Sequence, residues 1–204
     1  MKIRFLGHAG FIIEDRFKIS IDPYDSTAKE KVDFIFITHA HYDHCSPEDI
    51  ARLADPGKTV IIAPTDCLEK VAALGVRTVE VKPGREYNPG LKFRTIPAYN
   101  IGKPFHPKAN NWVGYLISGL EQSVYHCGDT DNIPEMAGLR PDVLLIPVGG
   151  TYTMDVKGAA AAIEAVSPRR VIPMHYGKIV GALDDALELQ RLTSFTVDIL
   201  EAEK

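Results

Sequence analysis

Short apolar runs and polar turns alternate along the chain, and their periods predict both strands and helices. In the first half, the pattern predicts strands at 2–7, 10–14, 17–21, 33–37, 60–63, 76–81, 85–88 and 91–96, with helices at 47–54 and 66–74. In the second half, it predicts strands at 112–118, 122–127, 142–146, 170–173 and 195–200, with helices at 155–166 and 183–192. A β-meander followed by alternating strands and helices is typical of an α/β or α+β fold.

Length and composition predict one globular domain over residues 1–204. The 204 residues suit a single domain with a sizeable core, and 45% hydrophobic with 25% charged residues is ordinary. A net charge of -4 gives no general surface for polyanions, so nucleic acid is not an expected partner. No apolar stretch approaches the ~20 residues that cross a bilayer, and no signal-peptide core is present. The three widely spaced cysteines indicate reduced thiols, so we expect a cytoplasmic protein.

The most informative segment holds His39, His41, Asp43 and His44 within six positions, between a predicted strand and a predicted helix. Packing periodicity would not place four such side chains so close together. Imidazole and carboxylate groups are the usual ligands of zinc, and they also suit manganese, iron or nickel. On an irregular loop, His39 and His41 can face one metal ion while Asp43 and His44 face a second.

Two further candidates follow apolar runs. Asp129 comes after the run 123–128, where it is either a metal ligand or a simple turn residue. His175 comes after 171–174, and we predict it as the last ligand of the second metal, beside Asp43 and His44. The alternative is a structural histidine in a glycine-containing turn.

The segment 39–44 resembles the HxHxDH signature of the metallo-β-lactamase superfamily. More closely, the chain resembles the small stand-alone predicted zinc-dependent hydrolases of that superfamily, near the L-ascorbate-6-phosphate lactonase branch. The similarity extends to the opening hairpin at 5–11, to Ile21-Asp22-Pro23, to Gly128-Asp129-Thr130 and to Met174-His175-Tyr176-Gly177. It implies a four-layer αββα sandwich with a metal groove along one edge of the two sheets. It also implies that Asp129 bridges the two metal ions.

The third ligand of the first metal site is open. Members of the superfamily place a histidine after the strand that here ends at Ile96, but Tyr99 or Asn100 occupies that position. His106 lies further along, in a loop restricted by prolines. We favour His106 because zinc is usually held by at least three protein ligands. Otherwise the first site lacks a third histidine, and Asn100 or water takes the missing ligand position.

Other residues are expected around the metals. Asp22 is predicted to orient a metal-bound histidine by accepting its outer N–H group. The family resemblance puts His8 near the groove, where it would touch substrate. Lys103, Lys108 and Lys178 would either give the groove a positive rim that favours anionic substrates or be ordinary solvated lysines.

Together these observations predict a binuclear metal-dependent hydrolase acting on a small-molecule substrate. A metal-bridged hydroxide would attack a carbonyl or phosphoryl centre in a lactone, ester or phosphodiester. Asp43 and Asp129 are the predicted catalytic residues, with Asp129 helping to position the nucleophile.

Three other functions remain open for this chain. A nuclease of the same superfamily would need a nucleic-acid arm, for which the chain has little room. An iron oxidoreductase of this fold usually carries glutamate at the position of His41. A non-enzymatic metal-binding protein would keep the ligands without turnover. Relatives often assemble, which leaves a homo-oligomer open.

Overall fold

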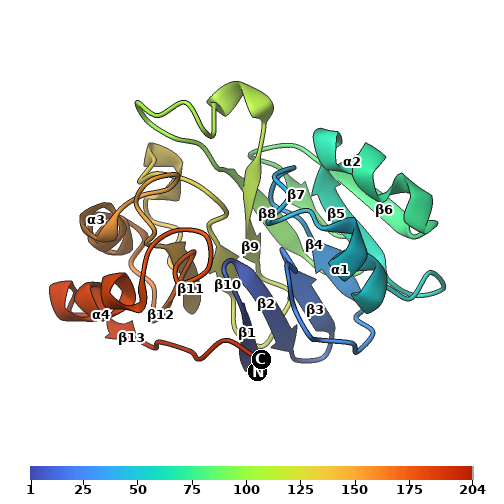
Figure 1. The fold of residues 1–204 in the computed structure, drawn as a ribbon, viewed down its shortest axis with the longest axis horizontal. Coiled ribbons are helices and arrows are strands. Elements are labelled where there is room, and N and C mark those ends of the chain that lie inside the picture. Colours follow the sequence, from blue (N-terminus) through green and yellow to red (C-terminus); the bar gives the residue numbers. More distant parts are fainter. Residues whose placement is uncertain (204) are drawn as a thin grey trace. The chain divides into compact units, whose positions relative to one another are not determined.

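Two mixed β-sheets organise the chain, one in each of two units (Figure 1). The computed structural model describes residues 1–203. The N-terminal unit comprises residues 1–82 together with the segment from Glu201, and the C-terminal unit comprises Pro83–Leu200. No helix within residues 1–203 is long and apolar enough to cross a bilayer.

The N-terminal unit is a six-stranded sheet covered by two short helices. Its elements are β1 (Lys2–Gly7), β2 (Gly10–Glu14), β3 (Lys18–Ile21), β4 (Phe34–Phe36), α1 (Pro47–Leu53), β5 (Val60–Pro64), α2 (Thr65–Val71), the 3-10 turn η1 (Ala72–Leu74) and β6 (Arg77–Val81). The strands follow sequence order, antiparallel from β1 to β3 and parallel from β3 to β6. The predicted helix at 66–74 is therefore an α-helix that tightens into a 3-10 turn.

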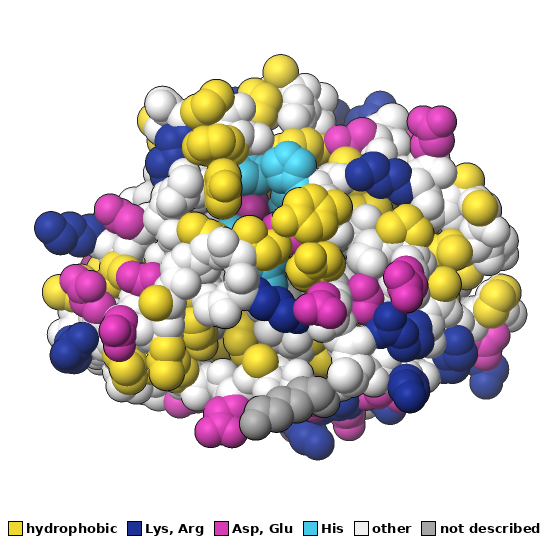
Figure 2. Space-filling view, in the orientation of Figure 1, with side chains coloured by type: hydrophobic (Ala, Val, Ile, Leu, Met, Phe, Trp, Pro, Cys, Tyr) yellow, Lys and Arg dark blue, Asp and Glu magenta, His cyan; other side chains and the backbone are white. Residues whose placement is uncertain are grey.

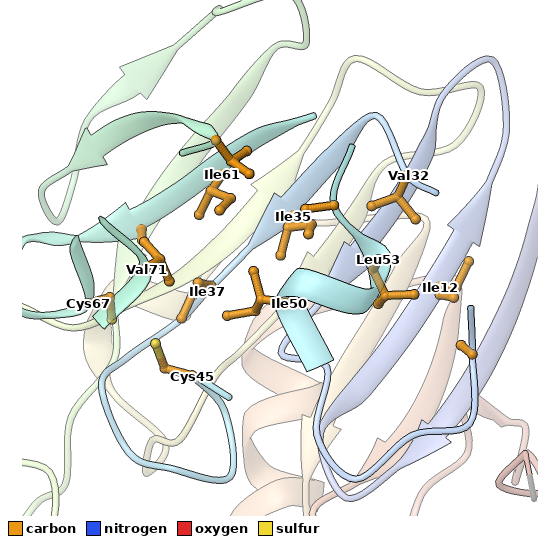
Figure 3. Packing of buried hydrophobic residues seen from close by; sticks show 14 of the residues in the cluster. Ile12, Val32, Ile35, Ile37, Cys45, Ile50, Leu53, Ile61, Cys67 and Val71 are labelled. Carbon is orange, nitrogen blue, oxygen red and sulfur yellow. The ribbon is translucent and has the colours of Figure 1, made fainter. Parts of the chain in front are cut away.

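One face of this sheet packs against the helices (Figure 3). Side chains alternate along an extended chain, so Ile35 of β4 and Ile37, directly after the end of β4, both face α1. They meet Ile50 and Leu53, which lie one helical turn apart on α1. Ser46 caps this helix, as its sequence predicts, with its side chain accepting the Asp49 N–H. The loop 39–44, which carries the candidate metal ligands, is therefore anchored at both ends by buried elements.

The C-terminal unit is a seven-stranded sheet with two helices. Its elements are β7 (Glu86–Tyr87), β8 (Phe93–Pro97), η2 (Lys108–Asn110), β9 (Val113–Ile117), β10 (Val124–His126), η3 (Pro134–Met136), β11 (Val143–Pro147), α3 (Val156–Val166), β12 (Arg170–Met174), α4 (Leu183–Leu192) and β13 (Thr196–Val197). The strand order is β13-β12-β11-β10-β9-β8-β7, with β10 to β13 parallel and β7 to β10 antiparallel. Helices α3 and α4 pack against each other.

Strand direction decides where the polar loops lie. In the N-terminal unit, parallel neighbours β3 and β4 lead into Asp22 and His39 at one edge of the sheet. In the C-terminal unit, β8, β10 and β12 run the same way, because two antiparallel steps separate β8 from β10. Each sheet thus collects its candidate site residues at the carboxyl ends of its strands, where α/β folds usually bind ligands.

The apolar periodicity located these elements closely. The main differences are the short β7 and β13 and the two unforeseen 3-10 turns, η2 and η3. Pro107 precedes η2 and Pro134 opens η3, and such single turns need no hydrophobic period. Helix α3 begins after its cap Asp155 and ends where Ser167 adopts a left-handed conformation before Pro168.

Candidate metal centre

Asp22 lies at the centre of the N-terminal cluster, which comprises His8, Asp22, His39, His41, Asp43 and His44. Its side chain is fully buried. One oxygen accepts the backbone N–H of Thr38 at 2.8 Å, and the other accepts from the Thr38 hydroxyl and from Nδ1 of His44, at 2.8 Å. The same Thr38 hydroxyl lies 3.0 Å from Nδ1 of His39. One carboxylate therefore contacts one histidine directly and another through a threonine.

These contacts fix the proton positions on both rings. An ionised carboxylate can only accept hydrogen bonds, so Nδ1 of His44 carries a proton and donates it. The Thr38 hydroxyl gives its single proton to Asp22, so it accepts from Nδ1 of His39. In both histidines Nε2 is then the atom with a lone pair, which is the form that ligates a metal.

His39 and His44 are each also paired with a second candidate ligand of the N-terminal cluster. Nε2 of His39 lies 3.0 Å from Nδ1 of His41, while Nε2 of His44 lies 3.8 Å from Oδ2 of Asp43. Two ligand atoms on one tetrahedral zinc ion lie roughly 3.3–3.6 Å apart. Both pairs are near this spacing. Nε2 of His8 lies 2.9 Å from the same Asp43 oxygen and holds that carboxylate in place.

Asp129 joins two histidines in the C-terminal cluster, which comprises Asn100, His106, Asp129 and His175. Its Oδ2 atom lies 3.2 Å from Nε2 of His106 and 2.9 Å from Nε2 of His175. All three side chains are buried. One carboxylate oxygen thus lies between two imidazole nitrogens in a buried position.

The tautomer of His106 follows from its outer contacts. Its Nδ1 atom lies 3.1 Å from Oδ1 of Asn100 and 3.1 Å from the carbonyl of Tyr152. Asn100 cannot be flipped, because its Nδ2 donates to Tyr152 and its Oδ1 accepts the His106 backbone N–H. Both neighbours of Nδ1 are acceptors, so Nδ1 carries the proton. Nε2 then faces Asp129 with a lone pair.

This donor set fits a divalent cation. In a neutral His106, two electron-rich atoms, Nε2 and the Asp129 oxygen, face each other at 3.2 Å in a buried site. A metal ion shared between them removes that repulsion, and imidazole with carboxylate is a normal zinc ligand set. In the N-terminal cluster, Asp22 is better placed to orient ligands than to bind metal, because both of its oxygens already accept hydrogen bonds.

Local backbone strain marks the same residues. Among the described residues, seven that are not glycine have positive φ, and three of them are His8 (54°), Asp22 (41°) and His175 (61°). Such conformations are costly and tend to persist at functional sites. Gly149 is also required here, because a Cβ atom would lie 2.3 Å from the His175 carbonyl oxygen. The backbone thus approaches His175 more closely than any side chain allows.

Each predicted site residue thus has a place in one of the two clusters. The sequence did not reveal Thr38, the Tyr152 carbonyl or Gly149 as supports. The position of Thr38 directly before His39 was an available signal. Tyr152 acts through its backbone, so its residue type carries no signal. The division of the ligands between two metal ions stays a prediction.

The fold and these clusters define the class of protein. Residues 2–175 match the β-lactamase superfamily domain, and the fold is the metallo-β-lactamase fold, with two mixed sheets flanked by helices. A UPF0173 metal-dependent hydrolase from Pyrococcus abyssi is 34% identical over 208 residues, which cover 94% of this chain and 92% of that protein. The chain therefore belongs to the UPF0173 metal-dependent hydrolase family of the metallo-β-lactamase superfamily.

Solved structures agree with this assignment. A crystal structure of a protein from Parabacteroides distasonis matches with a TM-score of 0.86 and 30% identity, covering 98% of this chain and 93% of that one. Igni18, a metallo hydrolase from Ignicoccus hospitalis, matches with a TM-score of 0.81 and 27% identity, covering 99% of this chain and 95% of that one. Similarity over nearly the full length supports the fold across both units.

Proposed function

We propose that the N-terminal and C-terminal clusters act together as one binuclear hydrolase centre. The first ion would be held by His39, His41 and His106, and the second by Asp43, His44 and His175. Asp129 would be shared by both ions. Each ion would then have at least three protein ligands, which is the usual number in catalytic zinc sites. Zinc suits these ligands best, and manganese, iron or nickel also fit them.

The contact that carries this proposal is the one between Asp129 and two histidines. Its Oδ2 atom lies within 3.2 Å of Nε2 in both His106 and His175. The Asn100 and Tyr152 oxygens keep the His106 proton on the far nitrogen. A buried carboxylate beside such a lone pair is stabilised by bound cations and is difficult to explain as a packing feature.

The chemistry divides between the ions and the chain. When bound, two divalent ions supply a nucleophile from water at neutral pH and polarise the substrate oxygen. Asp22 and Thr38 keep His39 and His44 in the ligating tautomer, and His8 holds the Asp43 carboxylate. The resulting reaction is hydrolysis of a small molecule at a carbonyl or phosphoryl centre. Lactones are one candidate class, as the resemblance to the lactonase branch implies.

Metal analysis and a substrate panel test this proposal together. Metal-loaded protein should hold about two divalent ions per chain and should hydrolyse at least one class among lactones, carboxylic esters, thioesters and phosphodiesters. His41→Ala and Asp129→Asn should abolish turnover while the circular dichroism spectrum stays native, because both residues lie on loops outside the cores. The matched control is His126→Asn. His126 accepts the Gly128 N–H through Nδ1, and an asparagine oxygen can take over that bond.

The outcomes separate the competing interpretations. Two ions with turnover that depends on His41 and Asp129 support the hydrolase. Two ions without turnover on any substrate class would indicate a metal-binding protein instead. Native metal content in both variants would overturn the ligand assignment itself.

A further inference from the structure

The lysines of the loop between β8 and β9 do not form an anion-binding rim. Nζ of Lys103 lies 2.6 Å from Oδ1 of Asp131 and also donates to the Thr153 carbonyl at 2.6 Å. Nζ of Lys108 lies 2.8 Å from Oε1 of Glu135. Both cations are therefore neutralised by carboxylates of their own unit. The sequence had left open a positive rim, and the structure removes Lys103 and Lys108 from it.

These ion pairs hold the loop in place. The Lys108 ammonium also lies 4.4 Å from the centre of the Tyr99 ring, and the Tyr99 hydroxyl donates to Glu135. The Lys108 hydrogen bond lowers the pKa of the Glu135 carboxyl, so the pair stays charged at neutral pH. Basic and acidic side chains are also interspersed on the face shown in Figure 2. Lys103 and Lys108 thus give an anionic substrate no cation that is not already paired with a carboxylate.

Exposed apolar side chains instead flank the candidate ligands. Tyr42 lies between His41 and Asp43 in the sequence and is 62% exposed. Phe105 directly precedes His106 and is 39% exposed, and Ile101 directly follows Asn100 and is 56% exposed. Single exposed apolar residues are normal on protein surfaces. Of the seven exposed large apolar side chains in the described part of the chain, three are sequence neighbours of candidate site residues.

The two rings are held by aromatic neighbours. Tyr42 makes an edge contact with Tyr24 at 5.7 Å between ring centres, and Tyr24 lies 6.3 Å from the His8 ring. Burial, together with Tyr42 and nearby carboxylates, raises the pKa of Tyr24, so it stays neutral. Phe105 makes an edge contact with Tyr152 at 4.8 Å. Each exposed ring is therefore partly ordered before any ligand arrives, which lowers the entropic cost of binding against it.

We infer that the centre takes uncharged esters or lactones whose acyl part is an alkyl chain or aryl ring, with Tyr42 in the N-terminal unit and Phe105 in the C-terminal unit each offering an apolar contact. This inference rests on the binuclear hydrolase proposed above. In the reaction, the water oxygen bonds to the acyl carbon and the bond from that carbon to the leaving oxygen breaks. One water proton goes to the leaving alcohol, and the carboxylic acid releases the other to solvent.

A chain-length series tests the apolar contact. The substrates are 4-nitrophenyl acetate, butyrate, hexanoate and octanoate, assayed with metal-loaded protein. Full burial of one CH2 group corresponds to about a fourfold gain, so a half-covered chain should raise kcat/KM by about twofold per CH2. Tyr42→Ala and Phe105→Ala should flatten that slope, while Tyr42→Leu should keep most of it. Leu192→Ala, at an exposed position of α4, is the matched control and should keep the full slope.

A charge series tests the exclusion of anions. A hexanoyl ester should be hydrolysed at least tenfold more efficiently than an ester with an acyl chain of the same length that ends in a free carboxylate. Equal or better hydrolysis of the carboxylated ester, or of a phosphorylated lactone, would overturn the inference. So would a flat chain-length slope in protein that hydrolyses the acetate.

Binding measurements separate this inference from the proposed function. Alkyl hydroxamates bind metal centres without being hydrolysed, and calorimetry reports their affinity directly. If no ester is turned over but the affinity still rises with chain length and depends on Tyr42, the apolar contact stands and the hydrolase proposal fails. If metal is bound and hydroxamate affinity ignores chain length, the apolar contact is wrong. Absence of metal binding would overturn both.

Discussion

Replacing Asp22 by asparagine should disturb two proposed metal ligands, His39 and His44, through one side chain. Asp22 accepts three hydrogen bonds from Thr38 and His44. In Asp22→Asn, the amide oxygen can keep the bond to the Thr38 N–H, and the amide nitrogen then faces His44 and the Thr38 hydroxyl. His44 must accept at Nδ1, and the Thr38 proton turns toward His39. Both rings then carry their proton on Nε2, the atom that should bind metal.

The size of the effect follows from the alternative amide orientation. A metal ion can restore both tautomers if the amide flips, which sets its NH2 group against the Thr38 N–H. An unsatisfied buried donor costs about 1–3 kcal/mol, or roughly a 5- to 150-fold loss of affinity. This agrees with the 10- to 100-fold losses typical when a partner of a metal-bound histidine is replaced. One flip corrects both His39 and His44, so the cost falls mainly on the first ion bound.

Zinc titration against a chromophoric chelator measures this directly. Wild-type protein should fill both sites tightly, whereas Asp22→Asn should bind its first ion 5- to 150-fold more weakly and its second with little further loss. Asp49→Asn is the control. Asp49 is also a buried carboxylate of this unit, but it accepts from Asp25, Ser26 and Ser46 instead of a histidine. It should lose stability without losing metal. Native affinity at both steps in Asp22→Asn would refute the tautomer argument.

Two further predictions concern other parts of the chain. His106→Ala should lose about one metal ion per chain and most activity, whereas Asn100→Ala, which removes only the outer contact to His106, should keep both ions; elemental analysis distinguishes them. Arg4→Ala should lower the free energy of unfolding at pH 7 by about 1–2 kcal/mol, because Glu14, Glu30 and Glu203 lose a shared partner that is only partly screened by solvent. The Arg4 hydrogen bond lowers the pKa of Glu203, so its share of this difference should be present above about pH 4.5 and vanish as the pH falls further; equal losses at pH 7 and pH 3 in urea unfolding would contradict that share.

The sequence predicted the elements well because apolar periodicity and caps are local signals. Ser46-Pro47 predicted the start of α1, and Pro168 predicted the end of α3. Apolar periodicity does not report the direction or order of strands. It therefore could not predict that the C-terminal segment would pair with β1. Ala202 pairs with Phe5 of β1, and Glu203 bonds to Arg4. These contacts join residues nearly 200 positions apart, and no local pattern encodes them.

The candidate ligands were predictable for a different reason than their supports. Histidine and carboxylate groups have few structural uses in dense clusters, so residue type alone singled out His39 to His44. The choice between Asn100 and His106 needed geometry, because it depends on the path of a loop without a period. In the structure His106 lies beside Asp129 and Asn100 contacts the His106 ring, while the choice of ligand stays a prediction. Backbone supports such as the Tyr152 carbonyl leave no trace in residue type.

The position of Asp22 implies that the two proposed metal sites cannot be tuned separately. His39 belongs to the first site and His44 to the second, yet both depend on this one carboxylate. An ion bound at either proposed site would favour Nδ1 protonation of its own histidine and so keep Asp22 as the acceptor of that hydrogen bond. The other histidine needs the same accepting carboxylate, so binding at one site would stabilise the ligating form at the other. This coupling requires no movement of the backbone, because protons on Thr38 and the two rings carry it.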